Sequence, residues 1–124
     1  MSTIQIEKMH AIVLYVSDLK KTQAFYAEQL GFEFGETMGE GIVMTGGGVL
    51  LFMEGGYTKR ERIPAREADV SVCFNVKGGV RGAFERLKQS GVTIATEYQE
   101  VEQGFAYFRM ADPDGNVFEI SGEP

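Results

Sequence analysis

The chain has 124 residues, of which 44% are hydrophobic, and its formal net charge is -6. This length suits one domain with a real core. The acidic balance disfavours nucleic acid and anionic membranes as partners, and no apolar run approaches the roughly 18 residues of a membrane span. The N-terminus lacks a signal-peptide pattern, so we expect a cytoplasmic protein. The single cysteine, Cys73, excludes an internal disulfide framework and a cysteine zinc site.

The first half of the chain predicts the order β-α-β-β-β. The apolar, β-branched run Met9 to Val16 predicts a strand, and the pair Ser17-Asp18 can cap a helix. Apolar residues then recur on one helical face until Gly31, which ends the helix. Three strands with glycine-containing turns between them follow at 32–36, 41–45 and 49–54.

The same order restarts after a basic stretch with little apolar periodicity. A strand is predicted at 70–76, followed by a helix that Gly91 ends. Further strands are expected at 92–97, 104–111 and 116–121. The halves align at a common offset of 60, because Val16 corresponds to Val76 and Gly31 to Gly91. The sequence therefore contains an internal repeat.

This repeat predicts the architecture of a single α+β domain over residues 1–124. Its βαβββ modules span 7–55 and 70–122, and 56–69 forms a linker. Each predicted sheet has one apolar face and one face with both polar and apolar side chains. Helices on the outside would cover the apolar faces. The other faces would together form an eight-stranded, concave mixed sheet around a cleft.

A stiff turn precedes the last predicted strand. The run Asp112-Pro113-Asp114-Gly115 has the residue types of a type I turn, in which the Asp side chain bonds the turn backbone. In the strand that follows, alternation sends Phe118 and Ile120 to one face and Glu119 to the other. Glu119 is therefore either a functional acid or an ordinary surface glutamate of a half-exposed sheet.

Strand alternation also predicts which side chains line the cleft. Tyr15 would stack on a planar ligand, unless it is an ordinary half-buried aromatic residue of its strand. Cys73 is expected to be a small buried filler rather than a nucleophile. The mixture of apolar, aromatic, amide, hydroxyl and acidic groups is typical of a site for a flat or amphipathic small molecule. The predicted lining comprises Ala11, Val13, Tyr15, Leu51, Met53, Ser71, Cys73, Asn75, Tyr107, Arg109, Val117 and Glu119.

Several motifs resemble the vicinal oxygen chelate superfamily. They are Leu-Tyr-Val-Ser-Asp-Leu at 14–19, Ala-Phe-Tyr at 24–26, Leu-Gly-Phe at 30–32 and the closing stretch 112–120. That superfamily includes glyoxalase I, extradiol dioxygenases, methylmalonyl-CoA epimerases, fosfomycin-modifying enzymes and bleomycin-resistance proteins. The resemblance covers nearly the whole chain and implies the fold, although one fold hosts many activities. It also implies a homodimer, with modules paired within one chain or exchanged between subunits.

The resemblance further implies where a divalent metal would bind. In the metal enzymes of the superfamily, the first and last strands of each half each supply one ligand, and imidazole and carboxylate groups suit zinc, nickel, iron or manganese. Glu119 stands at the last of these positions. The only histidine, His10, lies one residue before the first position and should face the other side of its strand. The remaining positions fall on residues that are poor ligands or none, namely Ala11, Ser71 and Leu50 or Leu51.

One suitable ligand in four favours a protein without a cofactor. We therefore predict metal-independent binding or sequestration of a small aromatic or cationic compound, as the resemblance to the bleomycin-resistance branch implies. The alternative is a glyoxalase-like lyase or isomerase, or a dioxygenase-like enzyme, with a divalent metal on Glu119 and His10 and with Glu119 as the catalytic residue. A third possibility is a partner-binding protein with a vestigial cleft.

Overall fold

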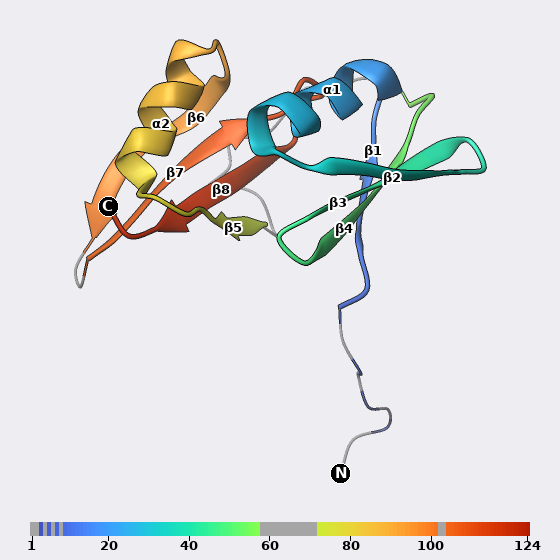
Figure 1. Ribbon diagram of the computed structural model, residues 1–124, viewed down its shortest axis with the longest axis horizontal. Coiled ribbons are helices and arrows are strands. Elements are labelled where there is room, and N and C mark those ends of the chain that lie inside the picture. The colour runs from blue at the N-terminus through green and yellow to red at the C-terminus, as the bar shows by residue number, and fades with distance from the viewer. Residues whose placement is uncertain (1–2, 4, 6, 8, 58–71, 102–103) are drawn as a thin grey trace. The chain divides into compact units, whose positions relative to one another are not determined.

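The computed structural model describes residues 3, 5, 7, 9–57, 72–101 and 104–124 (Figure 1). The chain divides into two compact units, residues 1–58 and residues 59–124, and each is described here by itself. Most of the predicted linker, as well as Ser71, lies outside the described residues. No helix in the described part of the chain is long and apolar enough to cross a membrane.

The first unit has the predicted βαβββ order. Helix α1 begins after Asp18, whose carboxylate accepts a hydrogen bond from the backbone N–H of Lys21 at 3.0 Å. It ends at Gly31, which adopts the left-handed conformation with φ 73°. The sheet order is β1-β4-β3-β2, with β1 parallel to β4 and the other pairs antiparallel. The elements are β1 (Ile12–Tyr15), α1 (Leu19–Leu30), β2 (Glu33–Met38), β3 (Gly41–Gly46) and β4 (Val49–Glu54).

The second unit repeats this topology. Its sheet order, β5-β8-β7-β6, matches that of the first unit position by position, and β5 is again parallel to its neighbour. The βαβββ repeat is confirmed, and the eight predicted strands form two four-stranded mixed sheets. A single concave sheet of eight strands stays a prediction. The elements are β5 (Cys73–Asn75), α2 (Val80–Gln89), β6 (Thr93–Val101), β7 (Phe105–Ala111) and β8 (Val117–Gly122).

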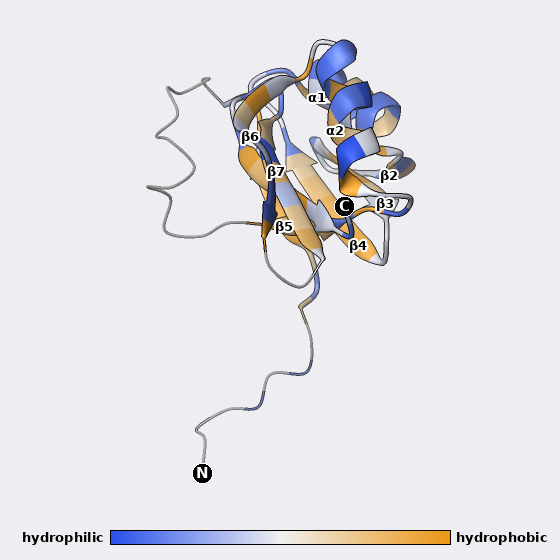
Figure 2. Cartoon of the chain, turned by 90° about the vertical axis from the view of Figure 1, so that its left-hand side faces the viewer, coloured by the Kyte–Doolittle hydropathy of each residue, from blue (hydrophilic) through white to orange (hydrophobic). Residues whose placement is uncertain are grey.

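Apolar side chains from one face of each sheet form the core of each unit. Figure 2 shows orange concentrated in the strands, whereas the two helices are mostly blue. In the second unit, the ring of Phe84 on α2 lies 5.2 Å from that of buried Phe108 on β7. In the first unit, Tyr26 on α1 is 2% exposed and its ring lies 5.9 Å from that of Phe32. Each helix therefore packs on the core face of the sheet in its own unit.

The prediction that Leu51 and Met53 share a face with Tyr15 is wrong. In the pairing of β1 with β4, Leu51 lies opposite Ile12 and Met53 opposite Leu14. Laterally paired residues share a face, and both side chains are buried in the core of the first unit. The sequence Val-Leu-Leu-Phe-Met is apolar at every position, so its pattern does not indicate which residues face inward.

The register of β3 and β4 leaves no room for a side chain at Gly41. A Cβ atom there would lie 2.5 Å from the carbonyl oxygen of Met53 and 2.9 Å from the Phe52 ring. Backbone cannot move aside as a flexible side chain can. We expect Gly41→Ala to lower the free energy of unfolding by about 1–3 kcal/mol, measured by urea denaturation.

The matched control is the same substitution on α2. At Gly82 a Cβ atom would meet the Nη1 atom of Arg86, the far end of a flexible side chain. Alanine also loses less conformational entropy than glycine on entering a helix, so Gly82→Ala should stabilise by about 0.5–1 kcal/mol. Equal effects of the two substitutions would contradict the packing described at Gly41.

Candidate functional site

The turn between β7 and β8 fixes the position of Glu119. Asp112 is 5% exposed, and its Oδ1 accepts hydrogen bonds from the backbone N–H groups of Asp114 and Asn116, both at 2.9 Å. The side-chain amide of Asn116 also donates to Oδ2 at 2.9 Å. Gly115 takes the left-handed conformation that closes the turn, with φ 88°. The predicted bonding of the turn by Asp112 is confirmed.

The register of β8 places Glu119 between a thiol and a guanidinium. Glu119 lies opposite Cys73 on β5 and opposite Arg109 on β7. Cys73 Sγ donates to Glu119 Oε2 at 2.9 Å, and Arg109 Nη2 lies 3.2 Å from Glu119 Oε1. The side chains of Arg109 and Glu119 are 25% and 14% exposed, so the ion pair is shielded from much of the solvent.

Cys73 is exposed, so the prediction of a buried filler is wrong. The environment of Cys73 nevertheless favours the neutral thiol. Loss of hydration, followed by the hydrogen bond to Glu119 and the charge of that carboxylate, raises the pKa of Cys73 to about 11. The positive charge of Arg109 acts in the opposite direction but is the smallest of these effects. A thiol that stays protonated at neutral pH is a weak nucleophile, and its main role here is to donate a hydrogen bond.

Further polar groups complete this face of the second sheet. Asn75 Nδ2 donates to Ser121 Oγ at 3.1 Å, and the Tyr107 hydroxyl donates to Gln99 Oε1 at 3.3 Å. The guanidinium of Arg109 lies 5.2 Å from the centre of the Tyr107 ring. We define the polar face as the five side chains that the pairing of β5, β7 and β8 brings together: Cys73, Asn75, Tyr107, Arg109 and Glu119.

The site residues predicted in the first unit are distributed differently. Val13 and Tyr15 are 43% and 47% exposed and share the face opposite the core. His10 is exposed and precedes β1. Beside Tyr15 the structure places Glu54, its partner on β4, and Tyr57, which the sequence reasoning did not include. The signal that was available is the acid at the end of the β4 strand, followed by Gly-Gly-Tyr.

The residues at the implied metal positions do not fit a divalent ion. Cys73 pairs with Glu119 in the second unit, and Val13 pairs with Phe52 at the equivalent position of the first. The counterpart of Glu119 in the first unit is therefore Phe52 rather than Leu50 or Leu51. A phenyl ring cannot ligate a metal. Glu119 itself already pairs with the guanidinium of Arg109. Among the described residues, no group of three or more His, Cys, Asp or Glu side chains could hold a metal ion.

The thiol of Cys73 offers a direct measure of this electrostatic arrangement. Because the thiolate is the reactive species, the rate of alkylation by iodoacetamide should rise about tenfold per pH unit and level off only near pH 11. Cys73 is the only cysteine in the chain, so the measured rate belongs to it alone.

Two variants should move the midpoint of this pH profile in opposite directions. Glu119→Gln removes the negative charge and should lower the midpoint, whereas Arg109→Met removes the positive charge and should raise it. A wild-type midpoint near pH 8.5, the ordinary value for a thiol, would contradict the geometry described for Cys73 and Glu119.

Comparisons with known proteins agree with this architecture. The Glyoxalase/Bleomycin resistance protein/Dioxygenase superfamily matches residues 8–120. Glutathione transferase FosA of Serratia marcescens is 29% identical over 118 residues, which are 93% of this chain and 80% of that protein. The uncharacterized protein YetH of Bacillus subtilis (strain 168) is 25% identical over 120 residues, 91% of this chain and 96% of that one.

Solved structures share the fold at lower identity. The structure of FosX, a genomically encoded fosfomycin resistance protein from Listeria monocytogenes, superposes with a TM-score of 0.80 at 23% identity. The match covers 97% of this chain and 96% of that one. Because the superfamily match spans both βαβββ units, the chain belongs to the glyoxalase/bleomycin resistance protein/dioxygenase superfamily, the vicinal oxygen chelate superfamily that its motifs resemble.

Proposed function

We propose that this protein binds a small molecule on the polar face of its second sheet and that it does so without a resident divalent metal. The observation that carries the proposal is the ion pair between Arg109 and Glu119, at 3.2 Å. The superfamily resemblance makes Glu119 the only one of the four implied metal positions with a ligating side chain. In this chain, that carboxylate already has a cation beside it.

A divalent ion on Glu119 would compete with this guanidinium. Two like unit charges 4 Å apart repel by about 4 kcal/mol in a partly shielded site, and a divalent ion would roughly double this repulsion. Arginine stays protonated in proteins, so it cannot relieve the repulsion by losing a proton. Displacing Arg109 would leave the ion with a single protein carboxylate, which is a weak site.

The chemistry of the polar face favours a flat, uncharged ligand that forms hydrogen bonds. Arg109 and Glu119 neutralise each other, which weakens any attraction for a cationic compound here. The donor groups of Asn75 and Tyr107 are engaged with Ser121 and Gln99, which leaves the Asn75 Oδ1 atom and the Tyr107 hydroxyl oxygen as hydrogen-bond acceptors beside this ion pair. The guanidinium and the Tyr107 ring both present flat surfaces against which a planar group can stack.

A second candidate function is that of an enzyme with a divalent metal. It is favoured by the 29% identity to FosA of Serratia marcescens, which is named a glutathione transferase. FosX of Listeria monocytogenes is named a fosfomycin resistance protein, which makes fosfomycin a substrate to test. This candidate requires Glu119 to exchange Arg109 for the metal.

The metal content of the purified, untagged protein separates the two candidates. We expect no stoichiometric zinc, nickel, iron or manganese by elemental analysis, even after incubation with each ion, because the guanidinium of Arg109 pairs with the Glu119 carboxylate. Near-stoichiometric metal that disappears in Glu119→Gln would overturn the binding proposal. Metal-dependent turnover of fosfomycin would do the same.

Ligand binding itself can be tested by a thermal-shift screen of uncharged aromatic compounds, with dissociation constants for the hits. Loss of one stacking partner weakens binding by about 1 kcal/mol, so Tyr107→Leu should raise the dissociation constant roughly fivefold. Tyr98→Leu is the matched control, because Tyr98 lies beside Arg81 and Phe84 of α2, on the other side of the sheet. Equal losses in both variants would argue against the polar face as the site.

A further inference from the structure

A second cluster of aromatic and acidic side chains lies in the first unit, where β1 and β4 end. Tyr15 and Glu54 are the last residues of these parallel strands and are direct partners. The Tyr57 ring lies 4.9 Å from the Tyr15 ring at an interplanar angle of 68°. The Tyr57 hydroxyl donates to Glu54 Oε2 at 3.4 Å. We call these three residues the tyrosine–glutamate cluster.

The backbone holds this cluster in place. Beyond β4, Gly56 has a φ of 86°, and the backbone N–H of Tyr57 donates to the carbonyl of Val16 at 3.1 Å. The N–H of Val16 in turn donates to the carbonyl of Glu54 at 2.8 Å. The two rings are 47% and 46% exposed, so they are accessible to a ligand although their positions are fixed.

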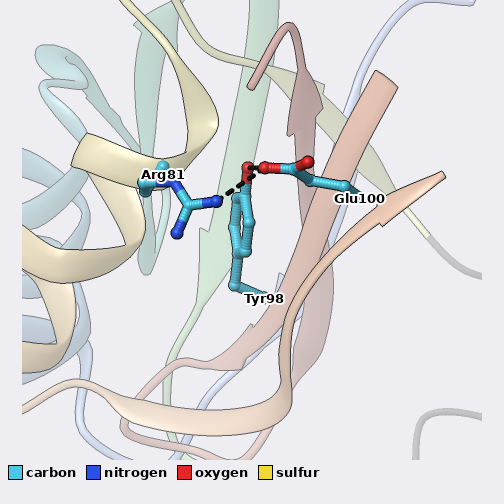
Figure 3. A network of polar contacts seen from close by, with 3 residues as sticks. All are labelled: Arg81, Tyr98 and Glu100. Atoms are coloured by element: carbon cyan, nitrogen blue, oxygen red, sulfur yellow. Dashed lines mark hydrogen bonds and ion pairs between the residues drawn. The ribbon is translucent and has the colours of Figure 1, made fainter. Parts of the chain in front are cut away.

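The second unit shows how a similar tyrosine–glutamate pair is completed by a cation. The Tyr98 hydroxyl donates to Glu100 Oε2 at 2.8 Å, and the Arg81 guanidinium lies 2.6 Å from the same oxygen (Figure 3). The guanidinium carbon lies 4.6 Å from the centre of the Tyr98 ring. The cation thus interacts with both the carboxylate and the aromatic ring.

The tyrosine–glutamate cluster has no such cation within the described part of the chain. No ion pair of Glu54 with a lysine or arginine is found there. Loss of hydration, the charge of Glu54 and the hydrogen bond to it raise the pKa of Tyr57, so the phenol stays neutral. Among the described residues, the cluster therefore presents one carboxylate beside two aromatic rings inclined to each other.

We propose that the tyrosine–glutamate cluster binds an organic cation of the quaternary or methylated ammonium class. A primary ammonium group is best bound by up to three hydrogen-bond acceptors, whereas the cluster presents a single carboxylate, one of whose oxygens accepts from Tyr57. A quaternary ammonium group donates none and is attracted by aromatic faces and by nearby negative charge. Calcium would require six to eight oxygen ligands. The cluster belongs to the first unit and the polar face to the second. The proposal for the cluster does not depend on the function proposed for the polar face.

The test uses the full chain and a matched pair of probes. Choline and 3,3-dimethyl-1-butanol have the same shape and differ in the charge of the central atom. In ¹H–¹⁵N spectra, choline should produce saturable shifts of the amide signals of Val16, Glu54 and Tyr57, at equal ionic strength set with potassium chloride. The neutral alcohol should bind at least tenfold more weakly. Equal binding of both probes, or no saturable shift with choline, would overturn the proposal.

Variants connect these shifts to the cluster. Tyr57→Leu and Glu54→Gln should each raise the dissociation constant of choline at least about fivefold, the effect of losing one cation–π or charge contact. Tyr57→Phe keeps the ring and should bind within about twofold of wild type. Tyr98→Leu, in the second unit, should leave choline binding unchanged. Undiminished binding in folded Tyr57→Leu and Glu54→Gln, as judged by their spectra, would place the cation elsewhere and reject the proposed site.

Discussion

The buried carboxylate of Asp112 sets the charge arrangement of the second unit. By holding the N–H groups of Asp114 and Asn116, it decides at which residue β8 begins. A slip of one residue would turn Glu119 toward the α2 side of the sheet, among apolar side chains, where an unpaired carboxylate is costly. The turn and the apolar residues Phe118 and Ile120 thus favour the same register. The contacts of Glu119 with Cys73 and Arg109 follow from it.

Within that register, Arg109 determines what Glu119 can do. A carboxylate that faces solvent without a nearby cation is free to take a metal or a cationic substrate. Beside a guanidinium at 3.2 Å, the same group becomes half of a neutral, hydrogen-bonding pair. The thiol of Cys73 reinforces this arrangement, because it donates to the other carboxylate oxygen. One cation on a neighbouring strand thus changes the electrostatic surroundings of the Glu119 carboxylate.

The sequence was informative where polar and apolar residues alternate strictly. In β5 and β8 the alternation assigns Cys73, Asn75 and Glu119 to one face, and the pairing of the strands places them together. In β4 every residue from Val49 to Met53 is apolar, so only the pairing with β1 reveals that Leu51 is buried and Phe52 is not. The sequence did not predict the tyrosine–glutamate cluster, because the position of Tyr57 depends on a backbone hydrogen bond to Val16 beyond the end of β4. The ion pair of Arg109 was missed because lateral register is not visible in a single strand.

The two βαβββ units carry their polar side chains at different positions of the same fold. In the second sheet, Cys73, Glu119 and Arg109 lie side by side on neighbouring strands. The residues at the equivalent positions of the first sheet are Val13, Phe52 and Val43, whose side chains are all apolar. Two residues further along these strands, the laterally paired residues are Asn75 and Ser121 in the second sheet and Tyr15 and Glu54 in the first. The acids Glu119 and Glu54 therefore have different neighbours within their own units. Glu119 contacts a thiol and a guanidinium, whereas Glu54 lies beside two tyrosine rings and accepts a hydrogen bond from one of them.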